Sequence, residues 1–105
     1  LEMAERSAIG VRIDAAAVPL LPGALDAASR GVRTSAHRHA GEQRDPRVRG
    51  SEAIDAARLA MLRDPQTSGG LLAAVAPGDA AALACAGYVA VGAFSAGAAG
   101  CVELR

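Results

Sequence analysis

The sequence predicts an α/β (α+β) sandwich, in which helices pack on a mixed sheet of about four strands. Helical and strand-like segments alternate along the 105 residues, and glycines and prolines fall between those segments. Hydrophobic residues make up 51% of the chain and charged residues 21%, and the formal net charge is +0, so the chain is globular. We expect residues 1–105 to form one domain, because a chain of this length can bury roughly 65% of its unfolded surface.

The composition argues against several function classes. Aromatic residues are 2% of the chain, so base-stacking platforms are missing, and a neutral chain has no global attraction to nucleic acid. All eleven basic residues are arginine, so any lysine-dependent chemistry must use a lysine from outside this chain. No apolar run reaches transmembrane length and no signal peptide opens the chain. We therefore expect no nucleic-acid partner, no membrane partner and a cytoplasmic location.

The first third of the chain contains a helix end, a strand and a second helix. Residues 1–7 read as the end of a helix that starts before Leu1, which suggests a fragment of a longer protein. Residues 11–14 alternate apolar and polar side chains, which is typical of a strand. Pro22 then restricts the backbone before a helix at 23–30, and Gly31 is placed to end it.

Residues 33–50 form a polar segment in which no helical or strand period survives. We interpret it as a long surface loop, and a hinge or an anion-binding flap is the alternative. His37 and His39 have no further ligand in register, so no metal site is expected. The basic and histidine side chains of this segment are Arg33, His37, Arg38, His39, Arg44, Arg47 and Arg49.

The second half predicts a helix, a strand, a further helix and two final strands. Ser51 is the expected N-cap of the helix that ends before Asp64. The apolar run at 71–76 reads as a buried strand, and residues 77–86 as the next helix, which Pro77-Gly78-Asp79 begins. Residues 88–94 and 101–104 are expected to pair as a hairpin. The two cysteines, Cys85 and Cys101, are expected to be buried and reduced, because neither a redox motif nor a zinc pattern is present.

The turn between helix and predicted strand carries the strongest functional pattern, Asp64-Pro65-Gln66-Thr67-Ser68-Gly69-Gly70-Leu71-Leu72. Pro65 ends the helix, and consecutive N–H groups of a glycine-rich turn, aided by hydroxyls, can receive phosphate oxygens. A phosphate-loop ATPase motif is absent, because it requires lysine. The alternative is a purely structural turn between helix and strand. The candidate phosphate- or nucleotide-proximal residues are Asp64, Gln66, Thr67, Ser68, Gly69 and Gly70.

The string DPQTSGGLL resembles the signature in the C-terminal domain of selenide, water dikinase (selenophosphate synthase), in the aminoimidazole ribonucleotide synthetase superfamily. Leu1-Glu2-Met3-Ala4, residues 11–14 and residues 19–25 look like the family's first helix, first strand and following helix entry. The resemblance implies an α/β sandwich that is partly ferredoxin-like. It is weakest at 33–50, where the family usually carries a Gly-Gly-Thr turn and this chain has Ser35-Ala36-His37.

The resemblance also implies a function. The family makes selenophosphate from selenide, ATP and water, with magnesium, and releases AMP and phosphate. Its catalytic cysteine or selenocysteine, lysine and metal-holding aspartates lie in an N-terminal domain, so no catalytic or metal-binding residue is expected here. The domain alone is then expected to be inactive and to bind neither ATP nor magnesium tightly. Its implied partners are its own N-terminal domain, ATP, selenide and, at full length, a second copy.

Two alternatives to this function stay open. Another ATP-using member of the superfamily, of the hydrogenase maturation factor or thiamine monophosphate kinase type, would share the architecture. A non-catalytic dimerisation or interaction module would account for the altered run at Ser35-Ala36-His37. An N-terminal half of the protein that contains a cysteine or selenocysteine near a lysine would favour an ATP-using enzyme. A concentration-dependent oligomer that does not respond to nucleotide would favour the interaction module.

Overall fold

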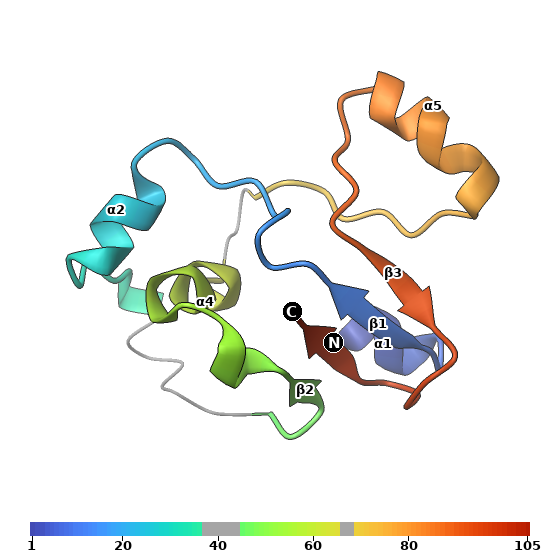
Figure 1. Cartoon of the computed structure of the whole chain (residues 1–105), viewed down its shortest axis with the longest axis horizontal. Helices are drawn as coiled ribbons and strands as arrows, with labels where there is room; N and C mark the ends of the chain where they lie inside the picture. Colours follow the sequence, from blue (N-terminus) through green and yellow to red (C-terminus); the bar gives the residue numbers. More distant parts are fainter. Residues whose placement is uncertain (37–44, 66–68) are drawn as a thin grey trace.

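A computed structural model describes residues 1–36, 45–65 and 69–105, and it confirms an α/β fold with helices packed on a mixed sheet (Figure 1). The sheet contains four strands, in the order β2-β4-β1-β3. Short 3₁₀ turns at Ser51–Ala53 and Pro77–Asp79 precede the helices α4 (Ala56–Arg63) and α5 (Ala80–Cys85). The elements in chain order are α1 (Glu2–Arg6), β1 (Gly10–Ile13), α2 (Ala24–Ser29), β2 (Val48–Arg49), α4 (Ala56–Arg63), α5 (Ala80–Cys85), β3 (Gly92–Ser95) and β4 (Val102–Leu104).

The strand β1 lies inside the sheet, between β3 and β4. It runs antiparallel to β3 and parallel to β4, and β2 adds to the other side of β4 in parallel. The predicted hairpin between the last two strands is therefore wrong. The backbone groups near its turn bond to β1 instead, since Gly100 N–H donates to the Ile9 carbonyl at 3.0 Å and Val11 N–H donates to the Cys101 carbonyl at 2.9 Å.

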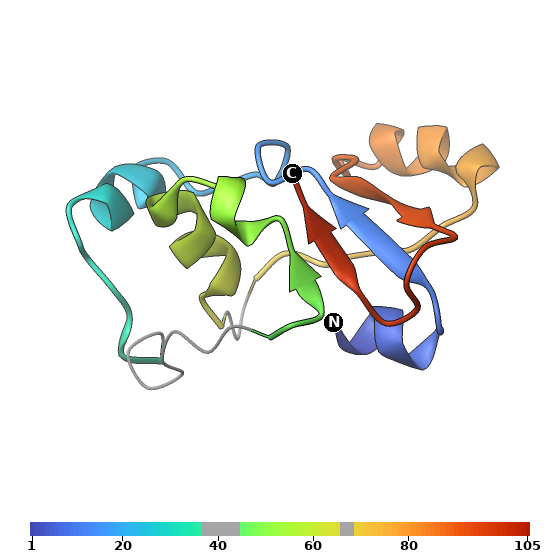
Figure 2. The same ribbon diagram turned by 60° about the horizontal axis from the view of Figure 1, so that its bottom comes forward.

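The core lies on one face of this sheet. Alternate side chains of β1 and β4 point to that face, where α1 contributes Ala4. Figure 2 shows α1 beside the sheet, and α2 and α4 together beyond the β2 edge. The paired helices bury small side chains, Ala28, Ala57 and Ala60. The main core cluster consists of Ala4, Val102 and Leu104, with Val11, Ile13, Val48, Ile54 and Leu59 packed against it.

The predicted buried strand at 71–76 is wrong. These residues lie outside the sheet, and Leu71 and Leu72 are 83% and 61% exposed. Both positions beside β1 are taken by β3 and β4, so the run has no place next to the central strand. In Figure 1 it crosses as a yellow segment from α4 towards α5.

The helix α4 begins four residues later than the sequence predicts. Asp55 is its N-cap, because its carboxylate accepts hydrogen bonds from the N–H groups of Ala57 (3.0 Å) and Arg58 (3.1 Å). Ser51 opens the short 3₁₀ turn instead, and Ile54 is extended between the two segments. The predicted helix end at Gly31 is confirmed, since this residue has φ 84°.

Two further expectations change in the described part of the chain. The surface loop predicted for 33–50 contains β2, since Val48 and Arg49 pair with Val102 and Glu103. Both cysteines are reduced, but Cys85 is exposed, so the expected buried pair is wrong. Among the described helices, none is long and apolar enough to cross a membrane.

Candidate functional site

The signature turn begins where α4 ends. Asp64 is the C-cap residue, its backbone is extended (φ −69°, ψ 120°), and its N–H donates to the Met61 carbonyl at 3.3 Å. Pro65 accounts for this conformation, because a residue before proline is pushed out of the helical region. The predicted helix stop at this point is confirmed.

The side chain of Asp64 is tied to a distant part of the chain. The hydroxyl of Thr34 donates a hydrogen bond to Asp64 Oδ1, across 30 residues of sequence. Thr34 follows α2 and Asp64 ends α4, and these two helices pack against each other. The first residue of the turn is thus fixed from two sides, by its own helix and by the segment after α2.

Sequence reasoning did not identify Thr34 as a site residue. A lone threonine in a polar segment carries no local signal for a contact 30 residues away. The packing of α2 on α4 brings the two residues together, and that packing depends on small side chains that are common throughout this chain.

The remaining candidates divide into two groups. Gln66, Thr67 and Ser68 lie outside the described residues. Gly69 and Gly70 are exposed, and a Cβ added at Gly70 would meet no atom within 4 Å. Gly70 is not among the glycines with a left-handed φ. What this glycine contributes is open space beside the backbone, where another group could approach. His37 and His39 also lie outside the described part of the chain, so only Ser35 and Ala36 of the run Ser35-Ala36-His37 are described.

Arginine side chains brace the helix pair next to the turn. Arg58 of α4 donates to the Ala16 carbonyl at 2.7 Å, and Arg33 donates to the Ala28 carbonyl at 2.7 Å at the end of α2. Asp14 accepts the Ala16 N–H at 2.9 Å, which orders the segment that Arg58 contacts. These bonds tie α4 to the segment after β1 and tie the segment that carries Thr34 to the end of α2.

An ion network links the predicted loop to α1 and the sheet. Arg47 contacts Asp45 through two nitrogens (2.9 and 2.7 Å) and Glu5 of α1 at 3.0 Å. The hydrogen bonds from Arg47 lower the pKa of Asp45 to about 2, and the same partners raise the pKa of Arg47. The Arg47 carbonyl also accepts the Val102 N–H at 2.9 Å. Arg47 therefore anchors the start of β2.

Within residues 1–36, 45–65 and 69–105, no three histidine, cysteine, aspartate or glutamate side chains gather as a metal site. What the described site offers is a surface turn with one carboxylate held by a hydroxyl, next to open space at a glycine.

The fold and this turn define the class of protein as an α/β domain with a glycine-rich surface turn entered from a helix. Comparison with curated proteins adds the family. The chain is 39% identical over 72 residues to selenide, water dikinase of Pseudomonas straminea, covering 69% of this chain and 20% of the relative. It is 42% identical over 85 residues to that of Pelobacter propionicus (81% and 24%) and 37% identical over 110 residues to that of Rhizobium meliloti (100% and 31%).

The resemblance drawn from DPQTSGGLL is therefore confirmed: this chain is similar to part of the selenide, water dikinases, as a selenophosphate synthase domain would be. The chain spans between a fifth and a third of the length of these relatives. No protein-family model matches the chain. No solved structure matches it either.

Proposed function

We propose that this chain is the C-terminal domain of a selenide, water dikinase, the enzyme that makes selenophosphate from selenide, ATP and water and releases AMP and phosphate. The observation that carries the proposal is the signature turn, in a chain 34–42% identical to enzymes of that name. Its entry is held by Thr34 and Asp64. The activity belongs to the complete protein, and the domain alone is inactive.

In this proposal the turn receives the phosphate end of the nucleotide. The N–H groups and hydroxyls of Gln66, Thr67, Ser68, Gly69 and Gly70 are the donors for phosphate oxygens. The Thr34 hydroxyl holds the Asp64 carboxylate at the entry to this segment, so the first residue of the turn is fixed before the phosphate arrives.

When they are bound in the complete enzyme, ATP would supply the phosphoryl group and magnesium would neutralise the charge of the phosphates. The described residues contain no carboxylate cluster and the chain has no lysine, so both are held mainly by another domain. That N-terminal domain would also supply the cysteine or selenocysteine that handles selenide.

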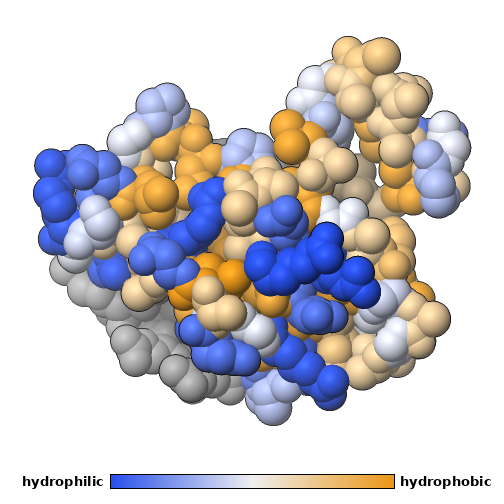
Figure 3. All heavy atoms as spheres, in the orientation of Figure 1, coloured by the Kyte–Doolittle hydropathy of each residue, from blue (hydrophilic) through white to orange (hydrophobic). Residues whose placement is uncertain are grey.

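The apolar surface around α5 supports a partner domain. Figure 3 shows mainly apolar residues over this protruding part, and residues 69–91 contain one charged residue, Asp79. Leu71 (83%), Val89 (57%) and Phe94 (47%), in the segments before and after α5, are exposed large apolar residues. Large apolar areas on a protein surface mark contacts with other protein surfaces. We assign this surface to the N-terminal domain, in an enzyme that works as a homodimer in the cytoplasm.

The product of the complete gene tests the role of the turn. Thr67→Ala and Ser68→Ala should lower selenide-dependent turnover of ATP, while the melting temperature stays within about 2 °C of wild type if the turn acts on the substrate and not on the fold. Ser29→Ala is the matched control, because the Ser29 hydroxyl bonds only to the Asp26 carbonyl within α2. Unchanged turnover in both turn variants would make the turn structural.

An interaction module is the second candidate, and the exposed apolar surface with the altered Ser35-Ala36-His37 run favours it. Such a module would form concentration-dependent oligomers and would not respond to nucleotide. A superfamily relative of the hydrogenase maturation factor or thiamine monophosphate kinase type would consume ATP without selenide. Measuring nucleotide consumption with and without selenide separates the three.

A further inference from the structure

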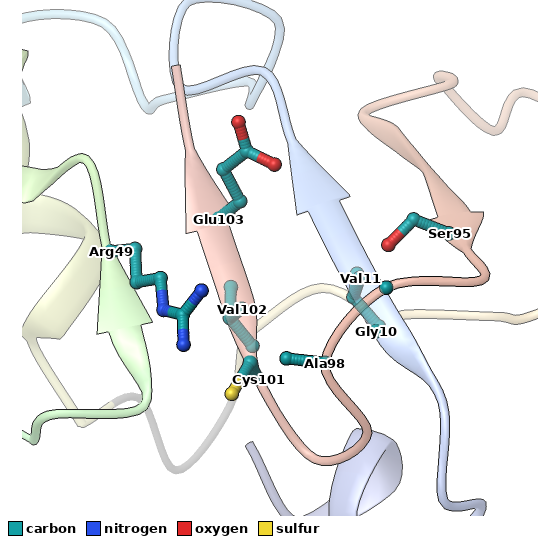
Figure 4. Close-up of a pocket in the computed structure, with 9 residues that line it drawn as sticks. Gly10, Val11, Arg49, Ser95, Ala98, Cys101, Val102 and Glu103 are labelled. Carbon is teal, nitrogen blue, oxygen red and sulfur yellow. The ribbon is translucent and has the colours of Figure 1, made fainter.

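The sheet has a second face, opposite the core, and a hollow of about 160 Å³ opens on it (Figure 4). In the register of the sheet, Arg49, Glu103 and Arg12 lie in one row across β2, β4 and β1. Their side chains alternate with the core residues Val102 and Val11, so they project to the opposite face. The residues that line the hollow come from all four strands and the turn before β4.

Arg49 brings an uncompensated positive charge to this hollow. In the described part of the chain its side chain forms no ion pair or hydrogen bond, whereas the Arg47 side chain is paired with Asp45 and Glu5. Glu103 also lines the hollow, but Arg12 neutralises it at 3.7 Å. The three charges leave a net +1, carried by a guanidinium that can bind an oxyanion through two parallel N–H groups.

The opposite wall of the hollow carries the Ser95 hydroxyl, with the carbonyl oxygens of Ser95 and Ala98 each 3.3 Å from the position of a Cβ at Gly10. Figure 4 shows Ser95 on β3 with its hydroxyl directed towards β1, and Arg49 approaching from β2 on the other side. Gly10 makes room for that hydroxyl, since a Cβ there would lie 2.6 Å from Ser95 Oγ. Gly97 and Ala98 line the same wall, and no described residue accepts their N–H groups.

We propose that this hollow binds a phosphate group, with Arg49 as the charged anchor and Ser95 and the backbone N–H groups of Gly97 and Ala98 as the neutral donors. It is separate from the signature turn, which follows α4, and does not depend on the function proposed for that turn. Phosphate is favoured over a carboxylate, because it brings more negative charge and more acceptor oxygens to the arginine. Glu103 weakens binding by repulsion and so sets a modest affinity.

Amide NMR titration of the chain with inorganic phosphate, at constant ionic strength, tests the proposal. The amides of Gly97 and Ala98 should shift, Arg49→Gln should weaken binding at least tenfold, and Glu103→Gln should strengthen it. Arg6→Gln is the matched control, because Arg6 is exposed on α1 and does not line the hollow. These three variants change exposed side chains, and their amide spectra verify that each is folded.

A parallel titration with AMP distinguishes the sources of the phosphate. If AMP binds more tightly than inorganic phosphate at the same amides, the hollow is assigned to a nucleotide. If AMP binds equally or more weakly, the hollow is assigned to free phosphate. The proposal is overturned if phosphate moves none of these amides at tens of millimolar, or if Arg6→Gln and Arg49→Gln weaken binding equally. It is also overturned if Glu103→Gln leaves the affinity unchanged.

Discussion

The Thr34 hydroxyl donates a hydrogen bond to the Asp64 carboxylate and thereby joins the segment after α2 to the first residue of the signature turn. If this bond positions the turn, Thr34→Val in the complete gene product should raise KM for ATP several-fold, and Thr34→Ser should restore it. The stability cost should be about 1 kcal/mol or less, because the hydrogen bond is exposed to solvent. A Thr34→Val enzyme with wild-type KM and kcat would show that the bond has no part in the site.

Asp45 and Arg47 make a contribution to stability that depends on pH. The pKa of Asp45 is about 2 in the folded chain, below its ordinary value of 3.8, so folding favours the charged carboxylate. The contribution is therefore complete above about pH 4 and is lost as the pH falls towards 2. Denaturant midpoints measured from pH 5 to pH 2 should fall less steeply in Asp45→Asn than in wild type.

Arg47→Gln provides the second arm of that experiment. It removes the partner that holds the Asp45 carboxylate, so its acid profile should flatten in the same way. Steep acid loss that persisted in both variants would assign the pH dependence to other carboxylates.

The N-cap of α4 distinguishes the observed helix start at Asp55 from the start at Ser51 that the sequence predicts. Asp55→Ala should destabilise the chain by about 1 kcal/mol, because two N–H groups of the first turn lose their acceptor. Ser51→Ala should cost less than about 0.5 kcal/mol, because no side-chain capping bond is made at the 3₁₀ turn. Thermal melts of the two variants measure both effects. The reverse order would restore Ser51 as the cap.

Glycines at two close contacts should be far more sensitive than the glycine of the turn. A Cβ at Gly92 would lie 2.1 Å from the Arg12 carbonyl oxygen, and one at Gly50 would lie 2.0 Å from that of Leu104, with φ 75° as well. Alanine at either position should cost more than about 1 kcal/mol of stability. Gly70→Ala, with open space around it, should melt as wild type does. Comparable melting of all three variants would contradict these contacts.

Local features were predictable where they depend on neighbouring residues. Pro65 predicts the end of α4, and Gly31 predicts the end of α2. The alternation of apolar and polar residues at 11–14 predicts a strand. All three features are observed. The predicted hairpin and the strand at 71–76 failed because strand order is a property of the whole sheet. An apolar run has the same pattern whether or not a strand is available to pair with it.

The site was predictable in part for the same reason. The turn and its family resemblance can be read from nine consecutive residues, and the relatives confirm the resemblance. Thr34 could not be identified, because its contact depends on the packing of α2 on α4. Arg49 was one of seven basic or histidine residues in the polar segment, and its place beside Glu103 depends on the register of β2 with β4. Both contacts join residues at least 30 positions apart.

The most direct test of the proposed function is a phosphorus NMR record of ATP mixed with the complete gene product, with and without selenide. The proposal predicts AMP, phosphate and selenophosphate only when selenide is present, and none from residues 1–105 alone. A folded complete protein that released AMP equally without selenide, or formed no product with it, would contradict assignment to a selenide, water dikinase.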